Sequence, residues 1–515
     1  MRTERRGSAL ILVLVSAIVL GLLVGALYAL FEANTRTQAW ADERIQARFT
    51  AEAGLNMAVH MIMEGADVPQ GDNPIQFLPE TGDWHYLGED MGWVQVWVDP
   101  HSRNDEVSSA NAYEVRCLSK VMSEDQPYSY GIASMVLPQN FAVYATFLNH
   151  GGGGYYGDGY RFDGPFHSNE AVWLSSQSAG RMDDPWFYSL SIVEDYYMYY
   201  NPSTGGLEVA TTPQYKNLYI EPYERMLLGE PYFVLGADSI PFGADEVNWE
   251  GAYNAANSGG LVLYPADGAR MILKNDTLLV KEGPGITAEV HDLSALSNPV
   301  VWIDNGPTET VYLKTEEELS GTGDFREHGL PNDMGLTIGV NGNLSVSGPI
   351  LYKDIDLTDP DNDGMLGFVV VEGNFTVAYD PDMWGGADWP DLGWHISTDD
   401  TDYNQLEVDA VVMVLDGVFQ LEDVMTVPYH TWPHPAIDLE IVGGVIINEE
   451  GITTWESSFG TYGYLSFITY DPRLMSMHPP YFPQTGEWDT AYWEERPDMS
   501  DDPGAGSNWI GWNRI

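Results

Sequence analysis

The residues of this chain that could do chemistry are mostly oxygen donors, and one short segment arranges them in a pattern typical of calcium binding. Asp359-Pro-Asp-Asn-Asp-Gly364 has carboxylates at alternate positions and a glycine where a metal-binding loop must turn sharply. The twelfth position of such a loop is Val370 rather than Glu, which excludes an EF-hand. The pattern therefore predicts either a looser calcium clamp or an acidic turn between strands. The candidate ligands are the carboxylates of Asp359, Asp361 and Asp363 and the backbone carbonyl of Met365.

The other reactive side chains form no recognisable catalytic set. The sequence has no Gly-x-Ser-x-Gly elbow and no glycine-rich phosphate loop. Carboxylate pairs are frequent because the chain is acidic, so they do not by themselves indicate glycoside hydrolysis. Among the 17 Trp, the densest group is Trp384, Trp389 and Trp394, which would either stack on sugar rings or pack in the core and in loops. We therefore expect no catalytic residues and no enzyme activity. The alternative to this expectation is a membrane-anchored β-helix protein that binds or cleaves polysaccharide.

Composition excludes further classes of function. Lys and Arg number 22 against 77 Asp and Glu, which gives a formal net charge of −55. Such a charge repels polyphosphate, so we expect no nucleic acid as a partner. A hydrophobic content of 44% and an aromatic content of 12% are too high for a disordered acidic tail. The single cysteine, Cys117, excludes an internal disulfide, and its alternating surroundings predict a buried strand position.

The first 65 residues carry the strongest signal. A basic leader, Met1–Gly7, runs directly into Ser8–Phe31, a stretch of 24 residues without a charge. As a helix rising about 1.5 Å per residue it would extend about 36 Å, enough to cross a hydrocarbon core of about 30 Å. The apolar region of a secretory signal peptide is only about 7 to 15 residues long. Three arginines precede the stretch and the next basic residue is Arg36, so we expect a cytoplasmic N-terminus and an external remainder.

The join between leader and apolar stretch resembles the prepilin signal of type IV pilins. Arg5-Arg-Gly-Ser-Ala-Leu-Ile-Leu-Val-Leu14 is similar to the start of minor pilins of the PilX type, and Phe49-Thr-Ala-Glu-Ala-Gly-Leu55 is similar to the Ala-Glu-Ala segment of that family. The resemblance implies that prepilin peptidase cuts between Gly7 and Ser8, and that the mature chain assembles with other pilin-like subunits. The alternative interpretation of the same residues is a plain signal anchor that holds a passive outer domain in the membrane.

One position departs from the family pattern. Leu12 stands at the fifth place of the predicted mature chain, where major pilins carry Glu. Minor pilins and the largest pseudopilins of type II secretion can lack this Glu. The resemblance therefore implies a minor subunit of a type IV pilus or of a type II secretion-like filament, at low stoichiometry or at the tip.

Helical spacing continues beyond the apolar stretch. Glu32 and Arg36 form a favourable i,i+4 pair, and Gly65 and Pro69 are stop signals. An apolar stripe at helical spacing predicts that this half of the helix packs on a globular head. The stripe consists of Ala51, Leu55, Ala58, Val59 and Ile62.

Strand patterns dominate after residue 70. Gly92–Asp99, Ala112–Ser119 and Tyr128–Val136 alternate with period two, which after a long helix predicts a small antiparallel pilin-like sheet laid on that helix. After Phe141, very short strands with Gly, Asn and Asp corners favour a parallel β-helix, or solenoid, and the alternative is a β-sandwich. Gly151–Gly154 is predicted to be a flexible hinge or a loop, at which proteolysis would release the outer domain.

Two further motifs resemble parts of an outer domain found behind pilin-type N-termini in bacterial envelope proteins. Gly164-Pro-Phe-His-Ser-Asn169 would open this domain, and Tyr470-Asp-Pro-Arg473 with Pro479-Pro-Tyr-Phe-Pro483 would close it. The expected location is the bacterial inner membrane, as a single-pass protein, and then the cell surface or pilus. The expected organisation is a leader at 1–7, a transmembrane and amphipathic helix at 8–66, a pilin-like head at 67–140 and a solenoid-like outer domain at 141–515.

Overall fold

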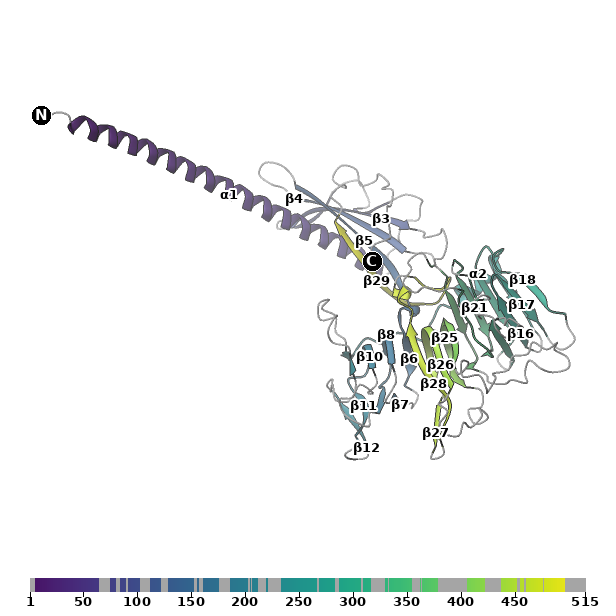
Figure 1. Ribbon diagram of the computed structural model, residues 1–515. Helices are drawn as coiled ribbons and strands as arrows, with labels where there is room; N and C mark the ends of the chain where they lie inside the picture. Colours follow the sequence, from purple (N-terminus) through teal and green to yellow (C-terminus); the bar gives the residue numbers. More distant parts are fainter. Residues whose placement is uncertain are drawn as a thin grey trace. The chain divides into compact units, whose positions relative to one another are not determined.

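The chain divides into two compact units. In this computed structural model the first unit, here called the head unit, comprises Met1–Ser102, Asn111–Leu137 and Trp488–Trp512, and the second, the outer unit, consists chiefly of Pro138–Glu487 (Figure 1). The structure describes residues 5–495 apart from 64–74, 80–83, 89–90, 102–111, 122–127, 152–154, 157–160, 176–185, 202–203, 205, 212–218, 221–232, 266–267, 283–286, 307–308, 316–328, 332, 354–361, 363, 378–404, 422–436, 452–453, 458–459 and 476.

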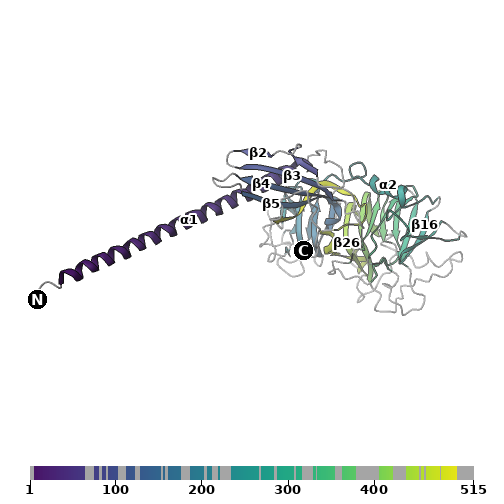
Figure 2. The same cartoon turned by 90° about the horizontal axis from the view of Figure 1, so that it is seen from above.

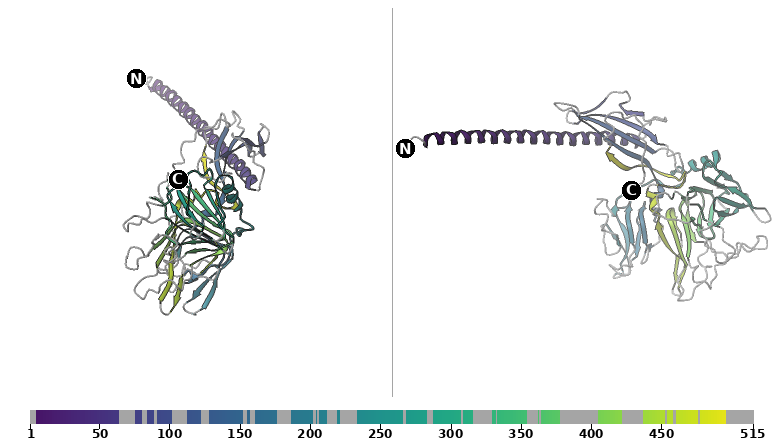
Figure 3. Two further views of the ribbon diagram at one scale, coloured as in Figure 1. Left: turned by 90° about the vertical axis from the view of Figure 1, so that its right-hand side faces the viewer. Right: turned by 45° about the horizontal axis from the view of Figure 1, so that its top comes forward.

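The head unit begins with one long helix. Helix α1 runs without a break over 59 residues, Arg5–Met63, and contains no proline. Figures 2 and 3 show it as a single rod whose C-terminal part lies along the strands of the head unit. The predicted continuity of the apolar and amphipathic halves is thereby confirmed.

The strands of the head unit form one six-stranded sheet. Its order is β1-β3-β4-β5-β29, with β2 beside β3, and the pairings of β3 with β1, β2 and β4 and of β4 with β5 are antiparallel. The three strands predicted from period-two patterns are present as β3, β4 and β5, so the predicted antiparallel sheet is confirmed. The strand bounds are β1 (Ile75–Leu78), β2 (His85–Gly88), β3 (Gly92–His101), β4 (Ala112–Val121), β5 (Tyr128–Asn140) and β29 (Gln484–Glu495).

The helix packs on this sheet through the predicted apolar stripe. All five stripe residues are buried, and they share a core with Val94, Val115 and Cys117 of the sheet. Gly54 lies at the closest approach, because a Cβ there would be 2.8 Å from both Cys117 Sγ and Val94 Cγ1. Ser119 Oγ donates a hydrogen bond to the carbonyl of Ala47 at 2.7 Å, which ties β4 to the helix. The packing therefore requires a residue without a side chain at Gly54.

The outer unit is an insertion between two strands of the head sheet. Strand β5 leads into it, and β29 leads back to pair beside β5. At its base, Thr485 Oγ1 donates to the carbonyl of Gln139 at 3.1 Å, and Asn140 Nδ2 donates to the carbonyl of Phe482 at 3.0 Å. The predicted boundary, which assigned all of 141–515 to the outer domain, therefore differs from the structure at its C-terminal end. A period-two pattern predicts a strand but does not say which strand it pairs with.

Most pairings in the outer unit are parallel, and they form long series. One series runs β15-β19-β21-β23-β25-β26-β6-β8-β10-β14, and a second runs β16-β20-β22-β24-β25. A smaller sheet has the order β12-β11-β9-β7. Figure 1 shows β25, β26 and β28 side by side. The predicted mostly-β character and parallel pairing are both present.

The bounds of the elements in the outer unit are β6 (Thr146–His150), β7 (Tyr155–Tyr156), β8 (Arg161–Ser168), β9 (Trp173–Ser175), β10 (Trp186–Ile192), β11 (Tyr197–Asn201), β12 (Gly206–Ala210), β13 (Tyr219–Ile220), β14 (Phe233–Leu235), β15 (Leu261–Leu263), β16 (Ala269–Lys274), β17 (Thr277–Lys281), β18 (Glu289–Asp292), β19 (Val300–Asp304), β20 (Thr310–Thr315), β21 (Leu336–Asn341), β22 (Asn343–Val346), β23 (Leu366–Val370), β24 (Phe375–Val377), β25 (Gln405–Leu421), β26 (Ile437–Glu450), β27 (Thr454–Ser457) and β28 (Gly460–Tyr470), with helix α2 (Glu250–Gly259) and the short 3-10 helices η1 (Phe141–Val143) and η4 (Pro472–Met475).

The long series of parallel strands is buried on both faces. Val301, Ile338 and Phe368 are aligned across β19, β21 and β23 and belong to one core, while the alternate residues Trp302 and Val369 belong to a second core on the opposite face. Helix α2 packs on this second face. Gly339 is required there, because a Cβ at this position would lie 2.1 Å from the indole ring of Trp302. Burial on both faces is typical of parallel sheets.

The chain enters this series in its middle. Strand β6 lies between β26 and β8, so residues far apart in sequence become neighbours. Gly151, directly after β6, is packed closely, because a Cβ would be 2.6 Å from the carbonyl oxygen of Ala171. The prediction that cleavage at Gly151–Gly154 would release the outer domain is therefore wrong, since the strands on both sides of this segment belong to the outer unit. Residues 152–154 themselves lie outside the described part of the chain.

The two motifs that resemble an outer domain meet in space. A Cβ on Gly164, in the opening motif, would lie 2.4 Å from the ring of Tyr470, in the closing motif. Tyr470 Oη donates to the carbonyl of Val143 at 3.0 Å, and Arg473 pairs with Asp471 at 2.6 Å with both side chains buried. The contacts of Tyr470 with Gly164 and Val143 join the first and last segments of the outer unit, and the Arg473–Asp471 pair lies within the closing motif.

Candidate assembly site

The apolar half of α1 is exposed on all sides. The large apolar side chains between Leu12 and Phe31 are each 50% to 72% exposed, although isolated proteins rarely expose so much continuous apolar surface. The most apolar window of the helix has a mean hydropathy of 2.6 and no buried residues. By length and composition the segment can serve as a membrane anchor or as a signal. In either role it requires an apolar environment that a single chain in water does not provide.

The predicted processing site lies at the start of this helix. Gly7 and Ser8 fall in the first turns of α1, which begins at Arg5. Leu12 is 71% exposed, and the chain carries no acidic residue between Arg5 and Phe31. The helix surface near the predicted mature N-terminus is therefore uncharged except for the terminal amine that cleavage would create.

Polar side chains begin abruptly after Phe31. Arg36 Nη2 donates to Glu32 Oε1 at 2.8 Å, which confirms the predicted i,i+4 pair. Thr35 Oγ1 donates to the carbonyl of Phe31, and Thr37 Oγ1 donates to that of Ala33, each at 2.9 Å. These threonine hydroxyls are satisfied within the helix, so they can remain in an apolar setting. Beyond them, the charged pair marks the end of the uncharged surface.

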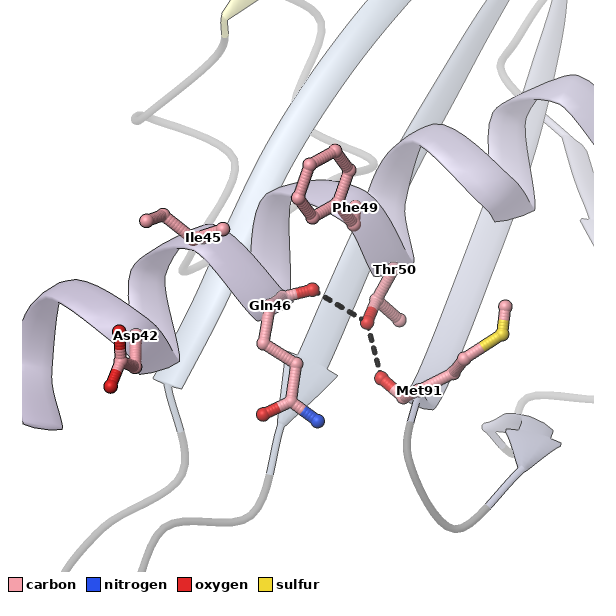
Figure 4. Close-up of a pocket in the computed structure, with 6 residues that line it drawn as sticks. All are labelled: Asp42, Ile45, Gln46, Phe49, Thr50 and Met91. Carbon is pink, nitrogen blue, oxygen red and sulfur yellow. Dashed lines mark hydrogen bonds between the residues drawn. The ribbon is translucent and has the colours of Figure 1, made fainter.

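A groove lies where α1 meets Met91, directly before β3. It has a volume of about 290 Å³ and is lined by Asp42, Ile45, Gln46, Phe49, Thr50 and Met91 (Figure 4). Thr50 Oγ1 donates to the carbonyl of Gln46 at 2.8 Å and also contacts the carbonyl of Met91, which ties Met91 to the helix. Ile45 and Phe49 are 53% and 64% exposed. Ile45 and Phe49 thus form a second exposed apolar area on α1, beyond the charged pair.

The candidate calcium ligands are only partly described. Asp359, Asp361 and Asp363 lie outside the described residues, as do Trp384, Trp389 and Trp394. The side chain of Met365 is buried in the core, and its carbonyl accepts a hydrogen bond from the backbone N–H of Leu336 at 2.7 Å. Asn362, between two of the aspartates, accepts a hydrogen bond from Arg473 Nη1 at 2.8 Å through its carbonyl. Over the described ranges, His, Cys, Asp and Glu form no metal-binding group of three or more.

The opening motif contains a polar chain that sequence reasoning missed. His167 Nδ1 is 2.9 Å from Ser191 Oγ, and His167 Nε2 is 3.2 Å from Asn169 Oδ1. Asn169 Oδ1 also accepts a hydrogen bond from the backbone N–H of Ile240 at 3.1 Å, and Asn169 Nδ2 donates to the carbonyl of Ile240 at 2.7 Å. His167 is 3% exposed and stacks on Phe147, and this burial lowers the pKa of its imidazole.

The order Ser191, His167, Asn169 resembles the nucleophile, base and orienting residue of a catalytic triad. The other contacts of these residues, however, are those of a structural anchor. Asn169 fixes the segment that contains Ile240, and Ser191 Oγ also donates to the carbonyl of Phe166 at 3.3 Å. Sequence alone could not reveal the set, because Ser191 joins it only through the pairing of β8 with β10.

Comparisons with known proteins give one structural neighbour. No protein-family model matches the chain, and no curated protein matches it. The crystal structure of the competence-associated pilin ComZ from Thermus thermophilus is similar at a TM-score of 0.30 and 12% sequence identity, over 88% of this chain and 97% of that chain. A TM-score of this size does not establish a common fold.

Proposed function

We propose that this chain is a pilin-like subunit that is held in a membrane by α1 and then assembles with other pilin-like subunits through the same helix. The observation that carries the proposal is the division of α1 into two continuous halves. One half is exposed and apolar from Leu12 to Phe31, and the other is seated on the head sheet through the stripe from Ala51 to Ile62. A secretory signal would be removed, and its apolar segment would have no structural continuity with the folded head.

The same helix can serve both environments because each is apolar. In a bilayer the backbone groups of α1 are satisfied internally and its side chains contact lipid. In a filament, neighbouring apolar helices would replace the lipid. Prepilin peptidase would cut between Gly7 and Ser8, with the N-terminus of the precursor in the cytoplasm of a bacterial cell and the two folded units outside its inner membrane.

The outer unit favours a minor subunit. It is an insertion of about 350 residues, Pro138–Glu487, in a head unit that has far fewer residues. The chain leaves the head sheet at the end of β5 and returns to it in the adjacent strand β29. We infer that it is a parallel β-helix, supported by the two series of in-register parallel strands. So large an insertion, together with Leu12 in place of Glu, favours low stoichiometry or the tip of a type IV pilus or type II secretion-like filament. The role is assembly rather than catalysis.

A cell-fractionation experiment tests this function. Filaments sheared from the cell surface should contain the chain, detected by its mass and by an antibody to the outer unit. Gly7→Ala should keep it in the membrane as the uncut precursor, while the matched variant Gly25→Ala, which meets nothing within 4 Å, should still reach the filament fraction. If both variants and the wild type stay in the membrane in cells that make filaments, the chain is a passive anchored protein and the proposal is wrong.

A further inference from the structure

The exposed end of the parallel series carries an aromatic and polar cluster that the assembly function does not use. Tyr264 directly follows β15 and is 61% exposed. Asp304 ends β19, and Asn341 ends β21 as its aligned partner. Leu263, Ile303 and Val340, each one residue earlier, point into the interior core. Because side chains alternate along a strand, the three cluster residues lie on the opposite face, where α2 packs.

Helix α2 fixes the aromatic part of the cluster. Trp249 stacks on the buried Trp302 with ring centroids 5.4 Å apart, and Tyr253 meets Trp302 edge to face at 5.5 Å. Tyr253 in turn hydrogen-bonds with the hydroxyl of Tyr264, near Asp304. The exposed ring of Tyr264 is thus held in one orientation, and a ligand would not have to order it. Figure 1 shows α2 close to β21, in this part of the outer unit.

The polar part of the cluster is a carboxylate that is held by an amide. Asn341 Nδ2 donates to Asp304 Oδ1 at 3.2 Å. Asn341 Oδ1 is a buried oxygen that has no hydrogen-bond partner among the described residues. Because this oxygen is buried, a ligand does not reach it, and the amide of Asn341 serves to hold the carboxylate of Asp304. The carboxylate of Asp304, which is partly exposed, lies beside it.

We propose that Tyr264 and Asp304, whose carboxylate is held by Asn341, form a binding site for a neutral saccharide. The C–H face of a sugar ring is electropositive and matches the negative face of an aromatic ring, while sugar hydroxyls donate to carboxylate oxygens. A calcium ion fits less well, because such an ion takes six to eight oxygens and this cluster supplies a single carboxylate. An acidic saccharide is excluded by Asp304 and by the net charge of −55.

Calorimetry on the full chain tests the site. The protein is kept in a detergent without a sugar headgroup and titrated with cellohexaose, maltohexaose and chitohexaose at millimolar concentrations. We expect at least one of the three to bind. Tyr264→Ala should weaken that binding about tenfold or more, equivalent to about 1.4 kcal/mol, whereas Tyr264→Phe, which keeps the ring, should weaken it by less than about threefold.

Two further variants separate the site from general effects. Asp304→Ala should weaken binding about tenfold, because a charge-assisted hydrogen bond is lost. Tyr86→Ala removes an exposed tyrosine of the head unit, 49% exposed, and should change nothing. Circular dichroism should show that each variant is folded. Absence of binding to all three sugars by the wild type, or equal binding by the wild type and a folded Tyr264→Ala variant, would overturn the proposal.

Discussion

Gly54 is the position at which the seating of α1 on the head can be tested most sharply. Alanine is about 1 kcal/mol more favourable than glycine within a helix, so Gly54→Ala should stabilise the chain if the helix surface were free there. In the structure the added methyl would lie 2.8 Å from Cys117 Sγ and Val94 Cγ1 and 3.0 Å from Val94 Cβ. Carbon atoms in contact are normally about 3.5–4.0 Å apart, so the helix or the strand must move.

The expected net effect is a loss of stability. Overpacking a core costs about 1–3 kcal/mol, and Val94 Cβ cannot move without its strand, so we take the upper part of that range. Subtracting the gain in helix propensity leaves about 1–2 kcal/mol of destabilisation, or about a 5- to 30-fold larger unfolded population.

The single thiol of the chain supplies the assay. Cys117 is 0% exposed, and burial raises the pKa of its thiol, so a maleimide should label it only when the head opens. Under native conditions Gly54→Ala should be labelled about 5 to 30 times faster than wild type. Gly21→Ala and Gly25→Ala, which meet nothing within 4 Å, should stay within about twofold. Because the new methyl also touches the thiol, thermal unfolding must rank the variants in the same order.

Labelling of Gly54→Ala no faster than that of Gly25→Ala would contradict this packing. That result would mean that α1 does not sit against β3 and β4 as described. It would also remove the structural basis for treating the second half of α1 as part of the head.

Three other predictions concern the outer unit. Burial lowers the pKa of His167, so the unfolded state takes up a proton first as the pH falls, and the stability of the fold should decrease as pH drops through about 6.5. The melting temperature should fall less steeply with pH for His167→Gln than for the wild type. Equal slopes of melting temperature against pH for the two proteins would contradict this prediction. Millimolar calcium should raise the melting temperature more than magnesium does, with about 2.7 kcal/mol of stabilisation at a hundredfold excess over Kd. Asp361→Asn with Asp363→Asn should abolish most of that rise, and an equal response in this double variant would indicate charge screening alone. A chain consisting of residues 138–487 should give a β-type circular dichroism spectrum, and a helix-rich one would show that this unit does not fold as described.

The head could be predicted well because its signals are local. The uncharged stretch from Ser8 to Phe31, the stripe from Ala51 to Ile62 and the strand around Cys117 each follow from spacing within a short segment. Periodicity of 3.6 or 2 residues reports which face of an element is buried, and that is all that the packing of one helix on one sheet requires.

For the outer unit, the sequence predicted the type of secondary structure and the parallel pairing, but not which strands are neighbours. Short strands with Gly and Asn corners indicated parallel pairing, but the position of β6 between β26 and β8 depends on contacts about 300 residues apart in sequence. The return of β29 to the head sheet and the meeting of Gly164 with Tyr470 are contacts of the same kind. Tyr264 and Asp304 also become neighbours only through the pairing of β15 with β19, so no spacing in the sequence brings them together.

N-terminal sequencing of the protein from native membranes tests the central claim most directly. If the chain is a pilin-like subunit, prepilin peptidase removes the basic leader, and the mature protein begins at Ser8. The exposed apolar half of α1 then starts at the new amine and remains part of the mature chain. An intact Met1 would contradict the claim by showing a plain anchor, and a start near Asp42 would contradict it by showing that the apolar segment is a signal that is removed.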